Sequence, residues 1–346
     1  MFLGRIVYVK VERKYAERVK RLLSEYGVLR HDVPVCREND HVLFPVCERC
    51  EEIAKYVPVE FVERDVAGRR GYRTYRDRLR GVVPEELFQR LPRSFEILGE
   101  IAIIEIPEDL QQYEKQVGEA LLKHHSKLRA VYAKEGPVSG KHRTPVLKLI
   151  AGEPVYETCY RESGAVFYFA PGRVYASIKL SGERLRVAQQ VQPGEVVLDM
   201  FSGIGGFAVL IARYVQRVLV YAVDINPVAV RYLAKNVAVN KLWGKVIPIE
   251  GDARRVAYAL RNKFSRVIMD LPYESVSFLD AALAAVREKG MIHVYTVERE
   301  RVVLEQLYQL GAEVEIIYRR EIKEIAPYRP KFVYDILVHE RRCSNQ

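Results

Sequence analysis

The hydrophobic residues from about position 191 onward fall into short continuous runs separated by longer amphipathic stretches. The runs at 196–200, 218–223 and 267–269 show no polar alternation, which is typical of strands buried on both faces. Helical patterns of about 10 to 15 residues alternate with them. This alternation predicts βαβ units and therefore an α/β fold, with a Rossmann-like, mostly parallel sheet over residues 191–346.

The chain before residue 191 has a mixed pattern that predicts two smaller α+β domains, at 1–68 and 69–190. In the first, 5–11 resembles a strand, and Ala16, Val19, Leu22 and Leu23 have helical spacing. The other short strands expected in this domain lie at 42–44 and 56–59. In the second, we expect a helix around 110–125 and strands at 101–106, 130–133, 145–151, 154–160, 165–169 and 174–177.

The composition is that of a globular, basic protein of 346 residues, in which 55 Lys and Arg oppose 45 Asp and Glu. The net charge of +10 fits a nucleic-acid partner, because phosphate neutralisation favours it, but it also fits an ordinary basic enzyme. No uncharged apolar run has the length of a membrane helix, and the N-terminus lacks the apolar core of a signal peptide. We therefore expect a cytoplasmic protein with no membrane partner.

An arginine run adds to the charge argument. Seven arginines lie between Arg64 and Arg80, interleaved with Tyr72 and Tyr75. Arginine can pair with phosphate and tyrosine can stack on a base, so the run predicts contact with RNA or DNA. The alternative is a solvated, basic connector between domains.

The cysteines give little support to a metal site. Cys47 and Cys50 form one Cys-x-x-Cys pair, whereas zinc sites usually add a second pair or histidines. We expect a local disulfide or buried thiols there, and no metal.

Acidic residues end four successive predicted strands of the C-terminal domain. They are Asp199, Asp224, Asp252 and Asp270. Ligands of open α/β sheets bind at the carboxyl ends of the strands, so the four acids mark a candidate site. The turn after the first acid contains Gly203 and Gly205 but lacks the third glycine of the dinucleotide fingerprint. A carboxylate at position 199, beside this turn, repels a phosphate and attracts a cation, such as the sulfonium or amino end of S-adenosylmethionine (SAM).

Each of the other acids has a plausible contact in a SAM site. Asp224 can accept both ribose hydroxyls. Asp252 can accept the adenine amine, and Ala253 leaves space for the ring. The loop 270–273 resembles the Asn/Asp-Pro-Pro-Tyr loop of methyltransferases acting on planar bases, where a polar side chain holds the target nitrogen and the aromatic ring stacks. A dinucleotide oxidoreductase, or acids that only shape strand-end turns, are the alternatives.

The segments 199–205, 224–227 and 251–253, with Asn236 and Asn240, resemble the archaeal and eukaryotic tRNA (guanine-37, N1)-methyltransferase family. Further segments resemble that family in the same order, at 94–107, 142–153, 161–164, 174–177 and 326–328. The resemblance implies class I methyl transfer from SAM to the base 3′ of the anticodon. It implies tRNA as the partner, through the anticodon stem-loop and, by way of the N-terminal domain, the elbow. We expect a monomer.

The resemblance also implies roles for single residues. Glu183 matches the general base for N1, with a helix-surface ion pair to Arg186 as the alternative. Arg143 matches an arginine that stabilises charge on guanine O6. The expected cofactor-binding set is Tyr175, Asp199, Phe201, Gly203, Gly205, Asp224, Ile225, Asp252, Ala253 and Asp270. The expected substrate-binding set is Arg143, Arg186, Pro272 and Tyr273.

Two departures from the family pattern concern the catalytic neighbourhood. Asp270 stands where the family usually has Asn, and a carboxylate only accepts hydrogen bonds. Lys179, an expected catalytic residue, stands where the family has an arginine with a bidentate fork. These changes leave open a wyosine-pathway enzyme at the same tRNA position. That enzyme is either a C7-methyltransferase, alone or in addition to N1 transfer, or an aminocarboxypropyl transferase, whose relatives tend to have Glu in place of Asp224. A non-catalytic tRNA-binding protein is the remaining alternative.

Overall fold

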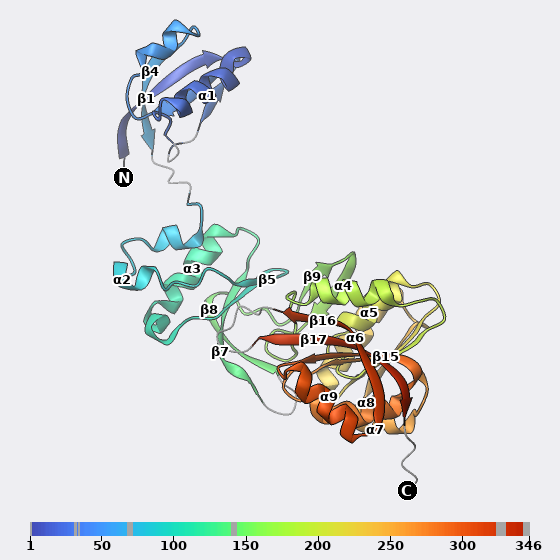
Figure 1. Cartoon of the computed structure of the whole chain (residues 1–346). Coiled ribbons are helices and arrows are strands. Elements are labelled where there is room, and N and C mark those ends of the chain that lie inside the picture. Colours follow the sequence, from blue (N-terminus) through green and yellow to red (C-terminus); the bar gives the residue numbers. More distant parts are fainter. Residues whose placement is uncertain are drawn as a thin grey trace. The chain divides into compact units, whose positions relative to one another are not determined.

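The computed structural model describes residues 2–30, 33, 35–67, 72–139, 144–322 and 330–341. The chain divides into two compact units, Met1–Arg78 and Leu79–Gln346, each of which is described by itself (Figure 1). The division predicted from sequence, into 1–68, 69–190 and 191–346, stays a prediction.

The first unit is an antiparallel sheet with one long helix. Its strand order is β2 (Cys36–Glu38), β3 (His41–Val46), β1 (Phe2–Glu12) and β4 (Glu60–Ala67). Helix α1 (Ala16–Glu25) buries Val19 and Leu23 in a cluster with Val9 and Phe44. The expected strand at 56–59 is wrong: the amides of residues 56 and 57 both bond to Ile53 O, closing the 3-10 helix Glu51–Lys55.

The second unit begins with a short helix and a small sheet. Its elements are α2 (Glu85–Phe88), β5 (Glu96–Leu98), β6 (Ile101–Ile104), α3 (Glu114–His124), β7 (Ala130–Ser139) and β8 (Thr144–Gly152). The strands run in the order β5-β6-β7-β8. Gly99 is required in the β5–β6 turn, where φ is +63° and an added Cβ would lie 2.1 Å from Cys159 O. The core of this sheet is continuous with that of the large sheet described next.

The large sheet has seven strands in the order β13-β12-β11-β14-β15-β17-β16. Five are mutually parallel, β17 is antiparallel to β15, and β16 is antiparallel to β17, so β16 runs in the same direction as the five. Their bounds are β11 (Val196–Asp199), β12 (Leu219–Asp224), β13 (Val246–Glu250), β14 (Phe264–Asp270), β15 (Val286–Thr296), β16 (Ala312–Ile322) and β17 (Lys331–Arg341). The mostly parallel sheet predicted for this region is confirmed.

Helices cover both faces of the large sheet (Figure 1). One face carries α4 (Ser181–Gln190), α5 (Gly206–Tyr214) and α6 (Pro227–Val239). The other carries α7 (Ala253–Ala259), α8 (Leu279–Ala285) and α9 (Glu300–Gln309). These two layers bury the non-alternating strands on both sides, which explains their continuous hydrophobic runs.

A two-stranded hairpin, β9 (Thr158–Glu162) and β10 (Ala165–Phe169), packs against α5 and α6. Asn236 and Asn240, one helical turn apart on α6, hydrogen-bond the backbone of β10 at Tyr168 and Val166. Two amide side chains thereby satisfy the edge of β10 that faces away from β9.

Two expected strands before β11 differ from the structure. The strand expected at 154–160 begins only at Thr158, because the amide of Val155 bonds to the Tyr132 hydroxyl at 2.9 Å. The strand expected at 174–177 is wrong: the Val174 amide bonds to Ala170 O and closes a turn, and residues 175–177 are irregular. The segments 141–143 and 326–328 lie outside the described residues.

Candidate active site

Three of the four predicted strand-end acids lie together at the carboxyl edge of the large sheet. Asp199 and Asp270 end the adjacent parallel strands β11 and β14, and Asp224 ends β12 on the other side of β11. The order of the strands reverses between β11 and β14, which is where open α/β sheets bind ligands. The predicted gathering of carboxylates at one edge therefore exists in the fold.

Asp199 is the most constrained of these acids. Its side chain is fully buried, and neither carboxyl oxygen has a hydrogen-bond partner of good geometry among the described residues. Burial, and then the charges of Asp270 and Asp224, raise the pKa of Asp199 to about 8, although the Phe201 and Ala208 amides oppose this. Such a group needs a cation or a proton beside it.

The glycine turn connects Asp199 to Asp224. The Gly203 amide donates to Asp224 Oδ2 at 2.7 Å, and the Asn226 amide donates to Oδ1 at 2.8 Å. Gly205 has φ +99°, and an added Cβ would lie 2.6 Å from the Leu233 side chain, so only glycine fits. A carboxylate only accepts hydrogen bonds, which is the chemistry that a ribose hydroxyl requires of Asp224.

The remaining cofactor candidates lie along the same strand ends. Asp252 caps α7 by accepting the Arg255 amide at 3.1 Å, and Ala253 is buried behind it. Phe201 packs edge-on against Phe278, with ring centroids 5.0 Å apart. Ile225, between Asp224 and the α6 cap Asn226, is half-buried. Tyr175 is exposed.

The loop after β14 is fixed by Ser275. The buried Ser275 hydroxyl lies within hydrogen-bond distance of the carbonyls of Met269, Leu271 and Tyr295. The Pro272 carbonyl accepts the Val297 amide at 3.0 Å. The Tyr273 side chain is left 60% exposed, which allows the stacking on a planar base that the sequence predicts.

Glu183, on the first turn of α4, is buried and held by three donors. Arg186 Nε donates to Oε2 at 2.8 Å, and the Tyr295 hydroxyl donates to the same oxygen at 3.4 Å. Arg320 donates to Oε1 at 3.3 Å through a side chain that is mostly exposed. The ion pair with Arg186 exists, but it is buried rather than on the helix surface.

Tyr295 connects this base candidate to the acids. It pairs with Asp270 across β14 and β15, and its buried hydroxyl donates to Glu183. Burial, followed by the charge of Glu183, raises the pKa of Tyr295 well above its usual range, so it remains a donor.

Other predicted residues lie elsewhere. Lys179 forms an ion pair with Glu96 of β5 at 3.4 Å, and Ser177 donates to the same carboxylate at 2.7 Å. Arg143 lies outside the described residues. Within the arginine run, the prediction that Tyr75 stacks on a base is wrong, because its ring is buried and burial raises its pKa to about 12.

The run also uses several of its arginines internally. Arg78 lies over the Tyr72 ring at 4.4 Å, and Arg64 pairs with Glu38. Cys47 and Cys50 are free thiols rather than a disulfide. Among the described residues, no group of three or more His, Cys, Asp or Glu could hold a metal ion.

Sequence reasoning missed the buried pair of Arg184 and Glu162. Arg184 Nη1 donates to Glu162 Oε2 at 2.5 Å, and Nη2 donates to Ser177 O at 2.8 Å. An added Cβ on Gly206, the first residue of α5, would lie 2.7 Å from Arg184 Nε. Arg184 thereby fixes the base-bearing helix α4 against the glycine turn. Both residues stand among polar neighbours in the sequence, so no local pattern signals this pair.

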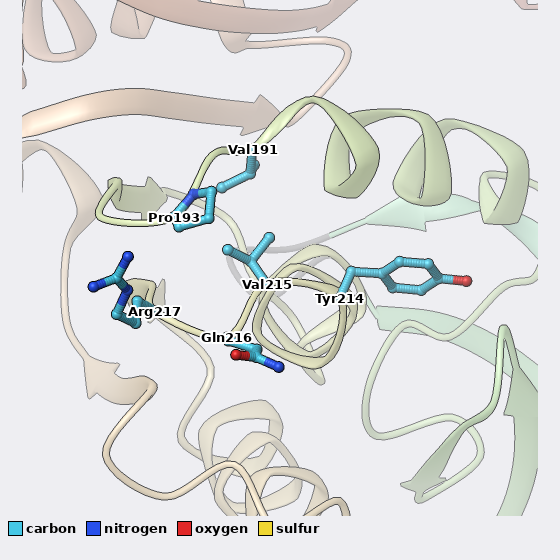
Figure 2. A pocket seen from close by; sticks show the side chains of 6 residues that line it. All are labelled: Val191, Pro193, Tyr214, Val215, Gln216 and Arg217. Atoms are coloured by element: carbon cyan, nitrogen blue, oxygen red, sulfur yellow. The ribbon is translucent and has the colours of Figure 1, made fainter.

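A pocket of about 270 Å³ lies at the opposite edge of the sheet (Figure 2). Its lining comes from the segments 191–193 and 214–217, which precede β11 and β12. It is therefore on the amino side of the parallel strands, away from the acids, and it takes no part in the site.

Comparisons with known proteins show the family of the chain. The TRM5/TYW2 methyltransferase domain model matches residues 158–316, the TYW2 N-terminal domain model matches 75–155 and the tRNA methyltransferase 5 N-terminal domain model matches 9–55. The chain belongs to the TRM5/TYW2 methyltransferase family, and it is a SAM-dependent enzyme of class I.

Two relatives cover almost the whole chain, and a third covers part of it. The tRNA (guanine(37)-N(1))-methyltransferase Trm5b of Pyrococcus abyssi is 38% identical, over 95% of this chain and 98% of its own. The solved complex of aTrm5 with tRNALeu is 28% identical with a TM-score of 0.80, covering 96% of this chain and 100% of that one. The tRNA 4-demethylwyosine(37)-methyltransferase Taw21 of Saccharolobus solfataricus is 35% identical over 60% of this chain and 79% of its own.

Proposed function

We propose that this protein transfers the methyl group of SAM to N1 of guanine 37 in tRNA. The observation that carries the proposal is the buried Glu183, joined through Tyr295 to the acidic strand ends. Identity to a Trm5b enzyme over 95% of the chain supports the same reaction. SAM supplies an electrophilic methyl group on a positively charged sulfur.

The residues present suit that cofactor. Asp199 is a buried carboxyl without a partner among the described residues, which fits a cationic group. Asp224 would hold the ribose and Asp252 the adenine amine. We infer that the exposed Tyr273 stacks on guanine while Asp270 and the Pro272 segment hold its edge.

The reaction requires one proton transfer to a group of the protein. Glu183 takes the N1 proton of guanine, and the freed N1 lone pair attacks the methyl carbon. The carbon–sulfur bond breaks with its electrons left on sulfur, which becomes a neutral thioether. We assign stabilisation of the developing charge on O6 to Arg143.

The expected tRNA contacts, location, oligomeric state and domain division are also part of this proposal. We propose that tRNA is bound by the anticodon stem-loop and the elbow, that the protein acts as a cytoplasmic monomer, and that its domains are those predicted from sequence. No helix in the described part of the chain is long and apolar enough to cross a membrane.

One experiment separates the candidate products. The protein is incubated with methyl-labelled SAM and three substrates, which are tRNA transcripts carrying G37 or A37 and tRNA carrying the tricyclic precursor at position 37. The digested nucleosides are identified by mass spectrometry. N1-methylguanosine from the G37 transcript alone supports the proposal. Methylation only of tRNA carrying the tricyclic precursor supports the C7 reaction instead, which the relationship to Taw21 makes the second candidate. An aminocarboxypropyl product would indicate the third activity, and no product on any tRNA refutes all three.

A further inference from the structure

A line of buried charged groups crosses the large sheet and ends at Glu183. It runs through Glu195, Arg266, His293, Asp335 and Arg186. His293 and Asp335 face each other across β15 and β17, and both side chains are fully buried. Neither residue touches the acidic strand ends, so the cofactor site does not explain them.

The direction of each hydrogen bond follows from arginine chemistry. Arg266 can only donate, so the 2.7 Å contact requires His293 Nε2 to accept. The proton of the neutral imidazole is then on Nδ1, which donates to Asp335 Oδ1 at 2.6 Å. Burial lowers the pKa of His293 and favours this neutral form.

Asp335 in turn holds Arg186 at two points. Arg186 Nη1 donates to Oδ2 at 2.5 Å and Nη2 donates to Oδ1 at 3.1 Å, with Gln190 adding a contact at 3.3 Å. The Arg186 guanidinium also lies over the Tyr318 ring at 4.2 Å. Because Nη1 and Nη2 of Arg186 are bonded to Asp335, the guanidinium is fixed. Its Nε donates to Glu183 Oε2 at 2.8 Å and so orients that carboxylate.

The two carboxylate oxygens of Glu183 therefore have different surroundings. Oε2 is fixed by Arg186 and Tyr295 inside the fold. Oε1 meets Arg320, whose side chain is 62% exposed and can move aside. Oε1 is therefore the oxygen turned toward an incoming base.

We propose that His293 and Asp335 are positioning residues that act through Arg186 to present Glu183 Oε1 to guanine N1. The inference rests on the proposed function, in which the N1 proton moves to Glu183. It also reassigns Arg186 from contact with the substrate to support of the base.

The test compares single-turnover methylation by wild type, Asp335→Asn, His293→Ala and His293→Asn. Asparagine can replace the Nδ1 donor of histidine, so His293→Asn should recover most of the rate that His293→Ala loses. Asp109→Asn is the matched control, because Asp109 also pairs with an arginine, Arg90 at 2.6 Å, and lies away from α4. Affinity for SAM and for tRNA, and the thermal midpoint, are measured on each variant.

We expect Asp335→Asn to slow single-turnover transfer by about 10- to 100-fold, while both affinities stay within about twofold. The groups that face Asp335 in this comparison are His293, Arg186 and Gln190.

Two results would overturn the inference. One is a single-turnover rate for Asp335→Asn that matches the rate of Asp109→Asn. The other is a parallel loss of SAM affinity, thermal midpoint and rate without recovery in His293→Asn, which indicates a structural role only. Absence of N1-methylguanosine with the wild type would instead refute the proposed function, so the two failures are distinct.

Discussion

The pKa of Asp199 makes SAM affinity depend on pH. Burial beside Asp270 and Asp224 raises it to about 8, so the free protein at pH 7 holds this carboxyl mostly protonated. A cation can occupy the neighbouring space well only when the carboxyl is ionised. Binding should therefore release a proton, and the affinity should rise as the pH rises toward 8.

The magnitude follows from the ionised fraction. With a pKa of about 8, roughly one molecule in ten is ionised at pH 7, and roughly one in a hundred at pH 6. The dissociation constant should fall about tenfold per pH unit below 8, or about 1.4 kcal/mol, and level off above it.

Calorimetric titration with SAM between pH 6 and 8.5, in two buffers of different ionisation enthalpy, measures both the affinity and the released proton. Asp199→Asn should bind more weakly at pH 8 and lose the slope. Asp252→Asn is the control, because it should weaken binding and keep the slope. S-adenosylhomocysteine keeps the amino group but lacks the positive sulfur, so a smaller slope with it assigns the sulfonium to Asp199. An equal slope with both ligands assigns the amino end.

The same carboxyl predicts an effect on stability with a definite sign. The folded pKa of Asp199 lies above the ordinary value of 3.8, so its protonated form favours folding and this contribution is lost as the pH rises from about 4 to about 8. Asp199→Asn should consequently unfold at a higher temperature than wild type at pH 8. A pH-independent dissociation constant in wild type, with no proton release, would refute the reasoning for both effects.

Three further changes test the framework that holds the site. Asn236→Ala removes the hydrogen-bond partner of the Tyr168 backbone in β10 and of the Ile204 carbonyl, so the free energy of unfolding should fall by about 3 kcal/mol in urea titrations. The exposed substitution Arg301→Ala is the control and should leave it unchanged. Gly205→Ala forces a Cβ into a left-handed position 2.6 Å from a leucine, so it should cost at least about 2 kcal/mol and weaken SAM binding; unchanged binding would contradict the role of the turn. Arg184→Met should destabilise by about 3 kcal/mol because Glu162 is left buried and unpaired, and adding Glu162→Met should restore most of that loss, whereas additive losses would refute the pairing.

The sequence was informative where local pattern decides position. A buried strand followed by a helix brings its last residue to the carboxyl edge, so Asp199, Asp224 and Asp270 could be placed together before any coordinates. The glycine turn is equally local, because its backbone conformation tolerates few residues.

Residues brought together by antiparallel pairing could not be found this way. His293 and Asp335 meet only because β17 enters the sheet in reverse between β15 and β16, and that register is a property of the whole domain. Their one local signal is a polar residue inside an apolar strand. Tyr75 shows the converse error: its neighbours in sequence are basic, but its ring is buried in the fold.

The two carboxyl groups central to the proposed reaction have opposite surroundings. The charged neighbours of Asp199 are the carboxylates Asp224 and Asp270, which disfavour its negative charge. That charge is therefore tolerated only when a cation binds beside it. The neighbours of Glu183 are donors, from Arg186, Tyr295 and Arg320, which hold it oriented before any substrate binds. A positive methyl donor is thus drawn to one carboxyl and a proton to the other, with Tyr295 interacting with both neighbourhoods. The net charge of +10 conceals this arrangement, because acids dominate only where the cation binds.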